Sequence, residues 1–198
     1  MSIEELINKK LEEAIEILKK FGMPSEQQNE RTAYCLLSLL NVTPEKAWKN
    51  AENPLVGITP MMTFAKEYYN KIYAPNSRET FRRFSTHQLV QAGIVLYNPD
   101  KPNRPVNSPK AVYQISPAAL KVIKTFGTSD FEPLLSDFIQ NQSTLAAQYA
   151  HEREMNMVSV KIKKNHMIQI SPGKHSELIR DIIEQLAPNN CTAHNPTI

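Results

Sequence analysis

Apolar residues in the first 40 positions recur every three or four residues, which is the spacing of one face of an α-helix. In residues 3–21 they alternate with lysine and glutamate, and Gly22 follows where a helix would end. Ser25 is placed to cap a second helix that carries Leu36, Leu37 and other apolar residues. The pattern predicts two amphipathic helices packed against each other.

Two further helices are predicted before residue 75. Thr43-Pro44-Glu45 has the cap, first-turn proline and acidic first turn of a helix start, and predicts a short helix around Trp48. Thr59-Pro60 predicts a longer helix that runs to residue 73. We expect its buried face to consist of Met61, Phe64, Ala65, Tyr68 and Ile72.

The pattern changes in residues 75–116. Ser77 is placed to cap a helix that ends at Gly93, and Ile94–Tyr97 and Ala111–Ile115 read as paired strands. Residues 98–110 between them are polar and contain four prolines, so they form an exposed loop rather than a tight turn. With the preceding helix, this order predicts a helix-turn-helix followed by a β-hairpin wing, the arrangement of a winged helix.

The two faces of the helix that begins at Ser77 differ in composition. At 100° per residue its buried side is predicted to hold Phe81, Phe84, Gln88, Leu89 and Ala92. The opposite side is predicted to hold Glu79, Arg82, Arg83, Thr86 and His87.

Charge is concentrated in the same region. The whole chain has a net charge of +3, whereas residues 76–110 contain six basic and two acidic residues, a net charge of +4. A basic helix followed by a basic loop favours contact with DNA phosphates, although a solvated helix face beside an ordinary hairpin is the alternative. The predicted DNA-binding residues are Arg78, Arg82, Arg83, Thr86, His87, Lys101, Arg104 and Lys110.

These residues are expected to have different roles. Arg82 and Arg83 are the candidates for guanine edges, because arginine donates two hydrogen bonds to O6 and N7. Arg78 in the first turn is expected to contact a phosphate. In the loop, Lys101, Arg104 and Lys110 are expected to contact the backbone or a minor groove.

The remainder predicts more helix and a second hairpin. Ser116-Pro117 opens a closing helix, and residues 129–155 form one long helix that either crosses the bundle or pairs as a coiled coil in a homodimer. After residue 156 the pattern predicts a β-hairpin, a helix and a disordered tail from Pro188. We therefore expect a mainly α fold with two parts: residues 1–156, a helical and winged-helix recognition domain, and residues 157–198.

Catalytic and metal-binding patterns are missing from the sequence. The five histidines and two cysteines have no metal-ligand spacing, and no acidic residue is followed two positions later by lysine, as a PD-(D/E)xK nuclease requires. No catalytic residue, metal ligand or cofactor is predicted. The charged amphipathic N-terminus is neither a signal peptide nor a membrane anchor, so a cytoplasmic protein without membrane contact is expected.

Several stretches together resemble one enzyme family. They are PSEQQNERTAYCLLSLLNVTPEKAWKNAENPLVGITPMMTFAKEYYNKIYAPNSRETFRRF, VLYNPDKPNRPVNSPKAVYQISP, EREMNMV and ISPGKHSEL. Over about residues 3–188 the chain resembles the BsuBI/PstI family of type II restriction endonucleases. The resemblance implies a helical recognition domain followed by a magnesium-dependent PD-(D/E)xK nuclease domain, acting as a dimer on the palindrome CTGCAG in a restriction-modification system.

The tail after Pro188 departs from the family pattern. The expectation is a truncated or split member that binds duplex DNA, lacks the catalytic core and depends on a separate nuclease fragment and its Mg²⁺ for cleavage. Two other functions remain open: a stand-alone winged-helix transcriptional regulator, and a winged helix that binds protein.

Overall fold

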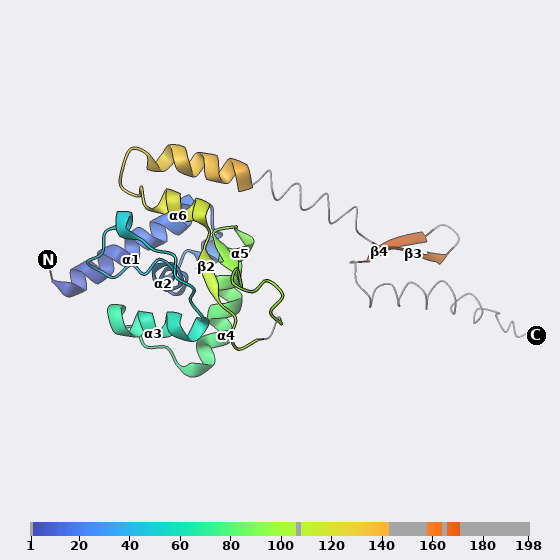
Figure 1. Cartoon of the computed structure of the whole chain (residues 1–198), viewed down its shortest axis with the longest axis horizontal. Coiled ribbons are helices and arrows are strands. Elements are labelled where there is room, and N and C mark those ends of the chain that lie inside the picture. The colour runs from blue at the N-terminus through green and yellow to red at the C-terminus, as the bar shows by residue number, and fades with distance from the viewer. Residues whose placement is uncertain (1, 106–107, 143–157, 164–165, 171–198) are drawn as a thin grey trace, which may run out of the picture. The chain divides into compact units, whose positions relative to one another are not determined.

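The computed structural model describes residues 2–105, 108–142, 158–163 and 166–170. The chain divides into two compact units, Met1–Gln142 and Ser143–Ile198. Within the first unit the fold is mainly helical, as predicted, with one small antiparallel sheet (Figure 1). The domain boundary predicted at residue 156 lies outside the described residues, as do the predicted C-terminal helix and tail.

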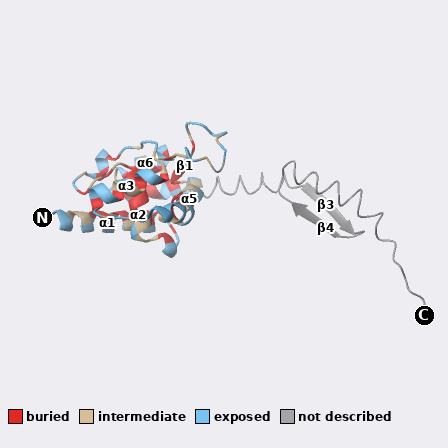
Figure 2. Ribbon diagram, turned by 90° about the horizontal axis from the view of Figure 1, so that it is seen from below, coloured by how far each residue is buried: buried red, intermediate tan, exposed pale blue. Residues whose placement is uncertain are grey.

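The centre of the first unit is α2 (Glu30–Leu39), in which every residue from Thr32 to Leu39 is buried. Helices α1 (Ile3–Lys20) and α3 (Ile58–Tyr69) pack against it, and buried residues concentrate along these contacts (Figure 2). The Asn29 side chain caps α2, whereas Ser25, the predicted cap, lies in a separate 3-10 turn, Ser25–Gln27. The predicted amphipathic helix pair is confirmed.

The short helix predicted around Trp48 is only a 3-10 turn, Trp48–Asn50. The Trp48 ring is buried, its Nε1 donates to Glu13 Oε2 at 2.7 Å, and the Lys10 Nζ lies 4.9 Å from the ring centroid. Burial of one large ring against α1 holds this segment in place without a longer helix.

Helix α3 ends a full turn earlier than predicted. Asn70 has a left-handed conformation (φ 54°) that stops the helix, so Ile72 is 75% exposed instead of lying in the core. Tyr69 replaces Tyr68 on the buried face, where its hydroxyl donates to the Val42 carbonyl oxygen at 2.7 Å. The predicted core positions Tyr68 and Ile72 were therefore wrong.

The predicted β-hairpin is present as β1 (Val95–Tyr97) and β2 (Tyr113–Ile115), with Val95 opposite Ile115. Val56, just before α3, forms an isolated antiparallel bridge with Tyr113 through two backbone hydrogen bonds of 2.9 Å. This bridge ties the hairpin to the start of α3.

Helix α6 (Pro117–Ile123) begins at the predicted cap, where the Ser116 hydroxyl accepts from the Ala119 N–H. Residues 131–142 form a further helix, the described part of the long helix predicted from Ser129. Its Phe138 ring meets Phe21 of the α1 C-cap edge-on at 5.1 Å, so this part packs across the bundle.

The second unit contains one described feature, the antiparallel hairpin of β3 (Val158–Lys163) and β4 (His166–Ile170). It agrees with the hairpin predicted after residue 156.

Candidate nucleic-acid interface

The helix predicted between Ser77 and Gly93 is continuous but not uniformly α-helical. It consists of α4 (Arg78–Phe81), a π-helical turn η4 (Arg82–Thr86) and α5 (His87–Gln91). At the end of the π turn the His87 N–H donates to the Arg82 carbonyl oxygen, five residues earlier. π-helical turns are rare in proteins, and those that occur often lie at functional sites.

The π turn changes which residues face the core. Because it contains more residues than an α turn, Ser85 and Thr86, four and five positions after Phe81, reach the interior. Phe84, three positions after Phe81 and predicted to be buried, is 48% exposed instead, and the Arg83 guanidinium carbon lies 5.5 Å from its ring centroid. The predicted sides of Phe84 and Thr86 were wrong for this reason.

Thr86 was also a predicted DNA-binding residue, and its side chain is fully buried. Its hydroxyl donates to the Phe81 carbonyl oxygen at 3.1 Å and lies 3.7 Å from the Cys35 and Met61 sulfurs. This hydroxyl holds the helix on the core, so we exclude Thr86 from the candidate interface.

Ser85 makes a second polar connection to the core. Its buried hydroxyl accepts hydrogen bonds from Arg31 Nε at 2.9 Å and from the Thr32 hydroxyl at 3.0 Å, both on α2. The buried side of the π turn is therefore hydrogen-bonded to the central helix, which fixes the direction of the exposed side.

The exposed side carries the remaining predicted residues of this helix: Arg78, Arg82, Arg83 and His87. Arg82 forms a bidentate ion pair with Glu79, with Nε–Oε2 at 2.9 Å and Nη2–Oε1 at 2.6 Å. The hydrogen bonds of this pair lower the pKa of Glu79 and raise the pKa of Arg82. Both groups are therefore charged at neutral pH.

The loop between β1 and β2 is braced internally. Arg104, a predicted DNA contact, pairs with Asp100 at 2.6 and 3.1 Å and donates to Asn98 Oδ1 at 2.7 Å. The same Asn98 oxygen accepts from the Val112 N–H at 3.0 Å, which links both ends of the loop. Only 12% of the Arg104 side chain is exposed, so it acts mainly as an internal brace.

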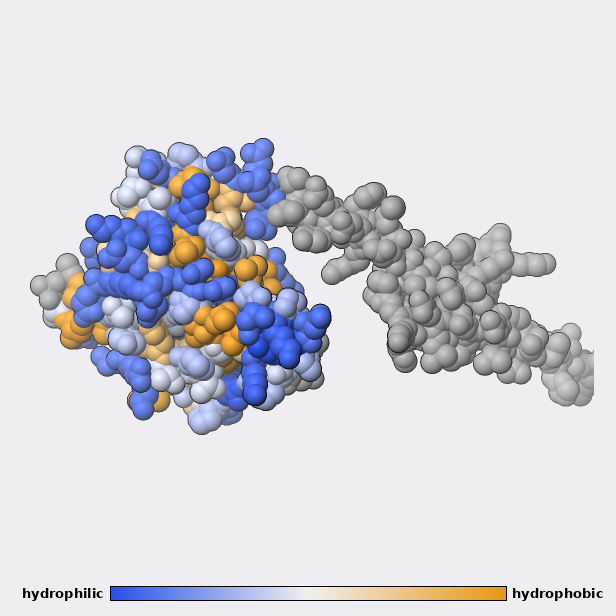
Figure 3. All heavy atoms as spheres, viewed as in Figure 1, coloured by the Kyte–Doolittle hydropathy of each residue, from blue (hydrophilic) through white to orange (hydrophobic). Residues whose placement is uncertain are grey.

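Lys101 and Lys110, the other two predicted residues of this loop, are exposed. Hydrophilic residues cover the part of the surface where the loop lies (Figure 3). The loop therefore presents two lysines on a hydrogen-bonded frame.

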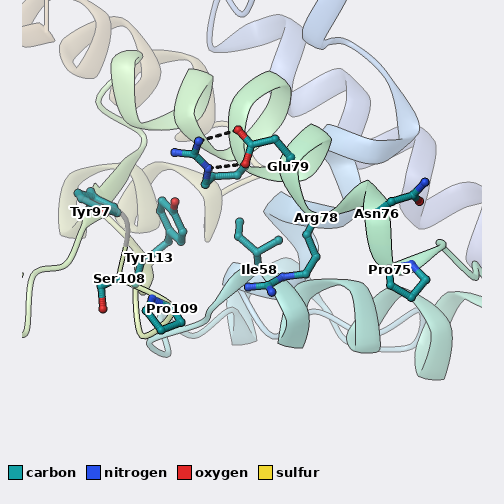
Figure 4. A pocket seen from close by; sticks show the side chains of 11 residues that line it. Ile58, Pro75, Asn76, Arg78, Glu79, Tyr97, Ser108, Pro109 and Tyr113 are labelled. Carbon is teal, nitrogen blue, oxygen red and sulfur yellow. Dashed lines mark hydrogen bonds and ion pairs between the residues drawn. The ribbon is translucent and has the colours of Figure 1, made fainter. Parts of the chain in front are cut away.

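A cleft of about 500 Å³ lies between the helix and the hairpin (Figure 4). Among the described residues that line it, Arg78, Glu79 and Arg82 come from the helix and Tyr97 and Tyr113 from the strands. The two tyrosine rings are 5.3 Å apart, and burial raises the pKa of Tyr113 to about 12. The cleft therefore places cationic, anionic and aromatic groups together.

Sequence reasoning placed Glu79 on the exposed side but did not include it in the site, and it missed Tyr97 and Tyr113. Glu79 stands three residues before Arg82, a spacing that puts two side chains side by side on a helix. That spacing was the available signal for Glu79. The tyrosines are brought to the helix only by the folded hairpin.

Metal binding and thiol chemistry have no support among the described residues. They contain no group of three or more His, Cys, Asp or Glu side chains arranged to hold a metal ion. Burial raises the pKa of Cys35 to about 12, which keeps its thiol protonated and unreactive. Across the part of the chain that is described, no helix has the length and apolar composition needed to span a bilayer.

Comparisons with known proteins point to one group. Residues 8–147 match the family model described as the BsuBI/PstI restriction endonuclease HTH domain. The chain is 58% identical over 178 residues to the type II restriction enzyme BsuBI of Bacillus subtilis, an alignment covering 90% of this chain and 56% of that enzyme. It is 37% identical over 172 residues to the type II restriction enzyme AplI of Arthrospira platensis, covering 87% and 53% of the two chains.

A solved structure is also similar. The SdaI restriction endonuclease matches with a TM-score of 0.65 and 31% sequence identity, over 91% of this chain and 56% of that one. This chain thus spans about half the length of the relatives it matches.

Proposed function

Because the chain belongs to the BsuBI/PstI restriction endonuclease family, we propose that residues 2–142 form a sequence-specific reader of duplex DNA. The observation that carries the proposal is the exposed side of the helix at residues 78–91. There Arg78, Arg82, Arg83 and His87 lie beside a loop with two exposed lysines, while the opposite side is fixed to the core.

We further propose that this unit is a winged helix. In chain order it contains α2, the bridge at Val56, α3, the helix at residues 78–91, β1, a long loop and β2. That order supports α3 and the following helix as the helix-turn-helix and the loop as the wing. The helix at 78–91 would then enter the major groove, with the wing against the neighbouring backbone.

The proposed roles follow from chemistry and exposure. Arg82, Arg83 and His87 contact base edges, since arginine matches the two acceptors of guanine. Arg78 in the first turn and the loop residues Lys101 and Lys110 contact phosphates, which fixes the register of the protein on the duplex.

CTGCAG is the site that we propose, on the strength of the family resemblance. Since this palindrome contains two identical half-sites, one chain would bind each half and the complex would be a dimer on DNA. Cleavage and its Mg²⁺ requirement are proposed for the complete family enzyme. No described residue is assigned to that step.

An electrophoretic shift assay tests the proposal with the 198-residue chain. A CTGCAG duplex should shift at lower protein concentration than a scrambled duplex of the same composition. Replacing Arg82 and Arg83 together by alanine should remove most of this preference, because each good arginine–guanine pair discriminates by roughly 1–3 kcal/mol. Lys9→Ala combined with Lys19→Ala is the matched control: it removes two exposed positive charges from α1, outside the proposed interface, and should retain the preference.

Two results would refute the proposal. One is the absence of any shift at low salt, which would favour a protein-binding winged helix. The other is an unchanged preference in the double-alanine variant, which would exclude Arg82 and Arg83 from the interface.

A further inference from the structure

The carboxylate of Glu79 lies on the proposed DNA-binding side, where a negative charge would repel phosphates. We propose that Glu79 determines specificity by accepting a hydrogen bond from the exocyclic amino group of cytosine, while Arg82 donates to the guanine of the same base pair. The inference rests on the proposed duplex binding and adds to it the base pair that this side of the helix selects.

Glu79 is placed to act together with Arg82. Its side chain is 61% exposed and lines the cleft, and it is the one acidic residue among the described residues that do so. Figure 4 shows its carboxylate turned toward the guanidinium it binds. A carboxylate that is exposed and also fixed in direction is suited to reading a hydrogen-bond donor.

The ion pair leaves donors and acceptors available on both partners. Glu79 occupies Nε and one hydrogen of Nη2, so both hydrogens of Nη1 and the second hydrogen of Nη2 remain for a further acceptor. Each carboxylate oxygen also retains a lone pair. The pair thus holds the guanidinium plane without using up its capacity to contact a base.

The order of these groups matches one base pair. Across the major groove a C·G pair presents the cytosine N4 donor and then the guanine O6 and N7 acceptors. An acceptor beside two donors, as in Glu79 and Arg82, complements that order. A T·A pair places the adenine N6 donor between two acceptors, which sets a donor against the arginine.

The ionised state of Glu79 also favours recognition of a hydrogen-bond donor on the base. The hydrogen bond from Arg82 lowers the pKa of Glu79, so the carboxylate is ionised at neutral pH and can only accept. It therefore rejects a base that presents an acceptor at this point.

A purely structural role makes a different prediction. An exposed pair at i and i+3 also stabilises a helix slightly. Loss of such a pair would change the affinity for every duplex by the same factor. Loss of a base contact would instead change the affinity for some duplexes relative to others.

The test measures how the full chain discriminates among four duplexes. CTGCAG is compared with TTGCAA, CCGCGG and CTATAG, each of which changes one base pair in both half-sites. Glu79→Ala should lower the discrimination against either TTGCAA or CTATAG by about tenfold for each half-site, and so by about 100-fold for a dimer that loses one base contact in each half. The discrimination against CCGCGG should stay unchanged. It should also bind an unrelated duplex more tightly, because a charge that repels phosphate is gone.

Glu79→Gln is a second variant that keeps the side-chain length. Its amide nitrogen can donate to thymine O4, the acceptor that a T·A pair presents in place of the cytosine amino group, so this variant should discriminate less against T·A at the position where wild type requires C·G. Glu132→Ala is the control: Glu132 forms an exposed ion pair with Lys20 and is 63% exposed, and its loss should leave every ratio unchanged.

The outcomes separate this inference from the proposed function. A wild-type chain that binds no duplex refutes both. A wild-type chain that discriminates, with Glu79→Ala keeping the same ratios, refutes only the role of Glu79. Equal weakening on all duplexes would assign Glu79 to helix stability and overturn the inference.

Discussion

The salt dependence of duplex binding should correspond to three phosphate contacts per chain, although residues 76–110 contain six basic side chains. Two of the six are already neutralised: Arg82 by Glu79 and Arg104 by Asp100. The other four make no ion pair with another described residue. They are Arg78, Arg83, Lys101 and Lys110. Arg83 is assigned to a base edge, which leaves the other three to contact phosphates.

The magnitude follows from counterion release. Each phosphate contact contributes about −0.9 to the slope of log K against log salt, so three contacts give about −2.7. Raising the salt from about 50 to about 200 mM should then weaken binding about 40-fold for each bound chain. Six contacts would give a slope of about −5.4 and a loss of about 1,800-fold, a clearly different result.

Fluorescence anisotropy of a labelled duplex, titrated at several salt concentrations, gives the slope, and measured stoichiometry converts it to a value for one chain. Lys101→Ala should make the slope less steep by about 0.9. Lys9→Ala removes an exposed lysine on α1, outside the proposed interface, and should leave the slope unchanged. A slope near −5.4, or equal slopes for the two variants, would refute the assignment of free and neutralised cations.

Two further predictions concern stability and the loop. Gly93 has φ +69° and a Cβ there would lie 2.3 Å from the Gln142 side chain, so Gly93→Ala should lower the free energy of unfolding by roughly 1–2 kcal/mol in urea denaturation. Gly57→Ala, at a position without positive φ, should cost less, and equal losses would contradict the explanation. The hydrogen bond from Arg104 lowers the pKa of Asp100 below its ordinary 3.8, so the pair stabilises the folded loop at neutral pH and this contribution disappears as the pH falls through the lowered pKa. An NMR titration should show the Asp100 pKa returning toward its ordinary value in Arg104→Ala, and an unchanged pKa would refute the pairing.

Local patterns were sufficient for the order and type of most elements. The helical spacing in residues 3–40, the cap at Ser116 and the strands on either side of residues 98–110 all depend on neighbours in sequence, and the structure agrees with each. Where one residue with left-handed geometry ended a helix, as Asn70 does, the pattern continued beyond the true end. The buried Tyr69 hydroxyl donates a hydrogen bond to Val42, 27 positions away, and this bond determines which tyrosine of α3 lies in the core.

The candidate site was predicted in outline from residue type. Arginines on one helix and lysines in the following loop indicate a basic surface whatever the exact packing, since charged side chains stay exposed unless they find a partner. The sequence could not show which of these basic side chains had an acidic partner in the folded chain. Arg104 meets Asp100 and Asn98 only because the loop folds back between β1 and β2.

The sequence by itself determined a mainly helical chain with a basic helix, a hairpin and a basic loop, because periodicity, caps and charge are properties of short segments. The tertiary structure decided which side of the helix is available. The hydrogen bonds that Ser85 accepts from α2 and the burial of Thr86 accompany a π turn, and that turn places Phe84 on the exposed side and Thr86 in the core. A fixed 100° per residue cannot anticipate a turn that core packing stabilises, so the exchanged positions of Phe84 and Thr86 could be identified only in the folded chain.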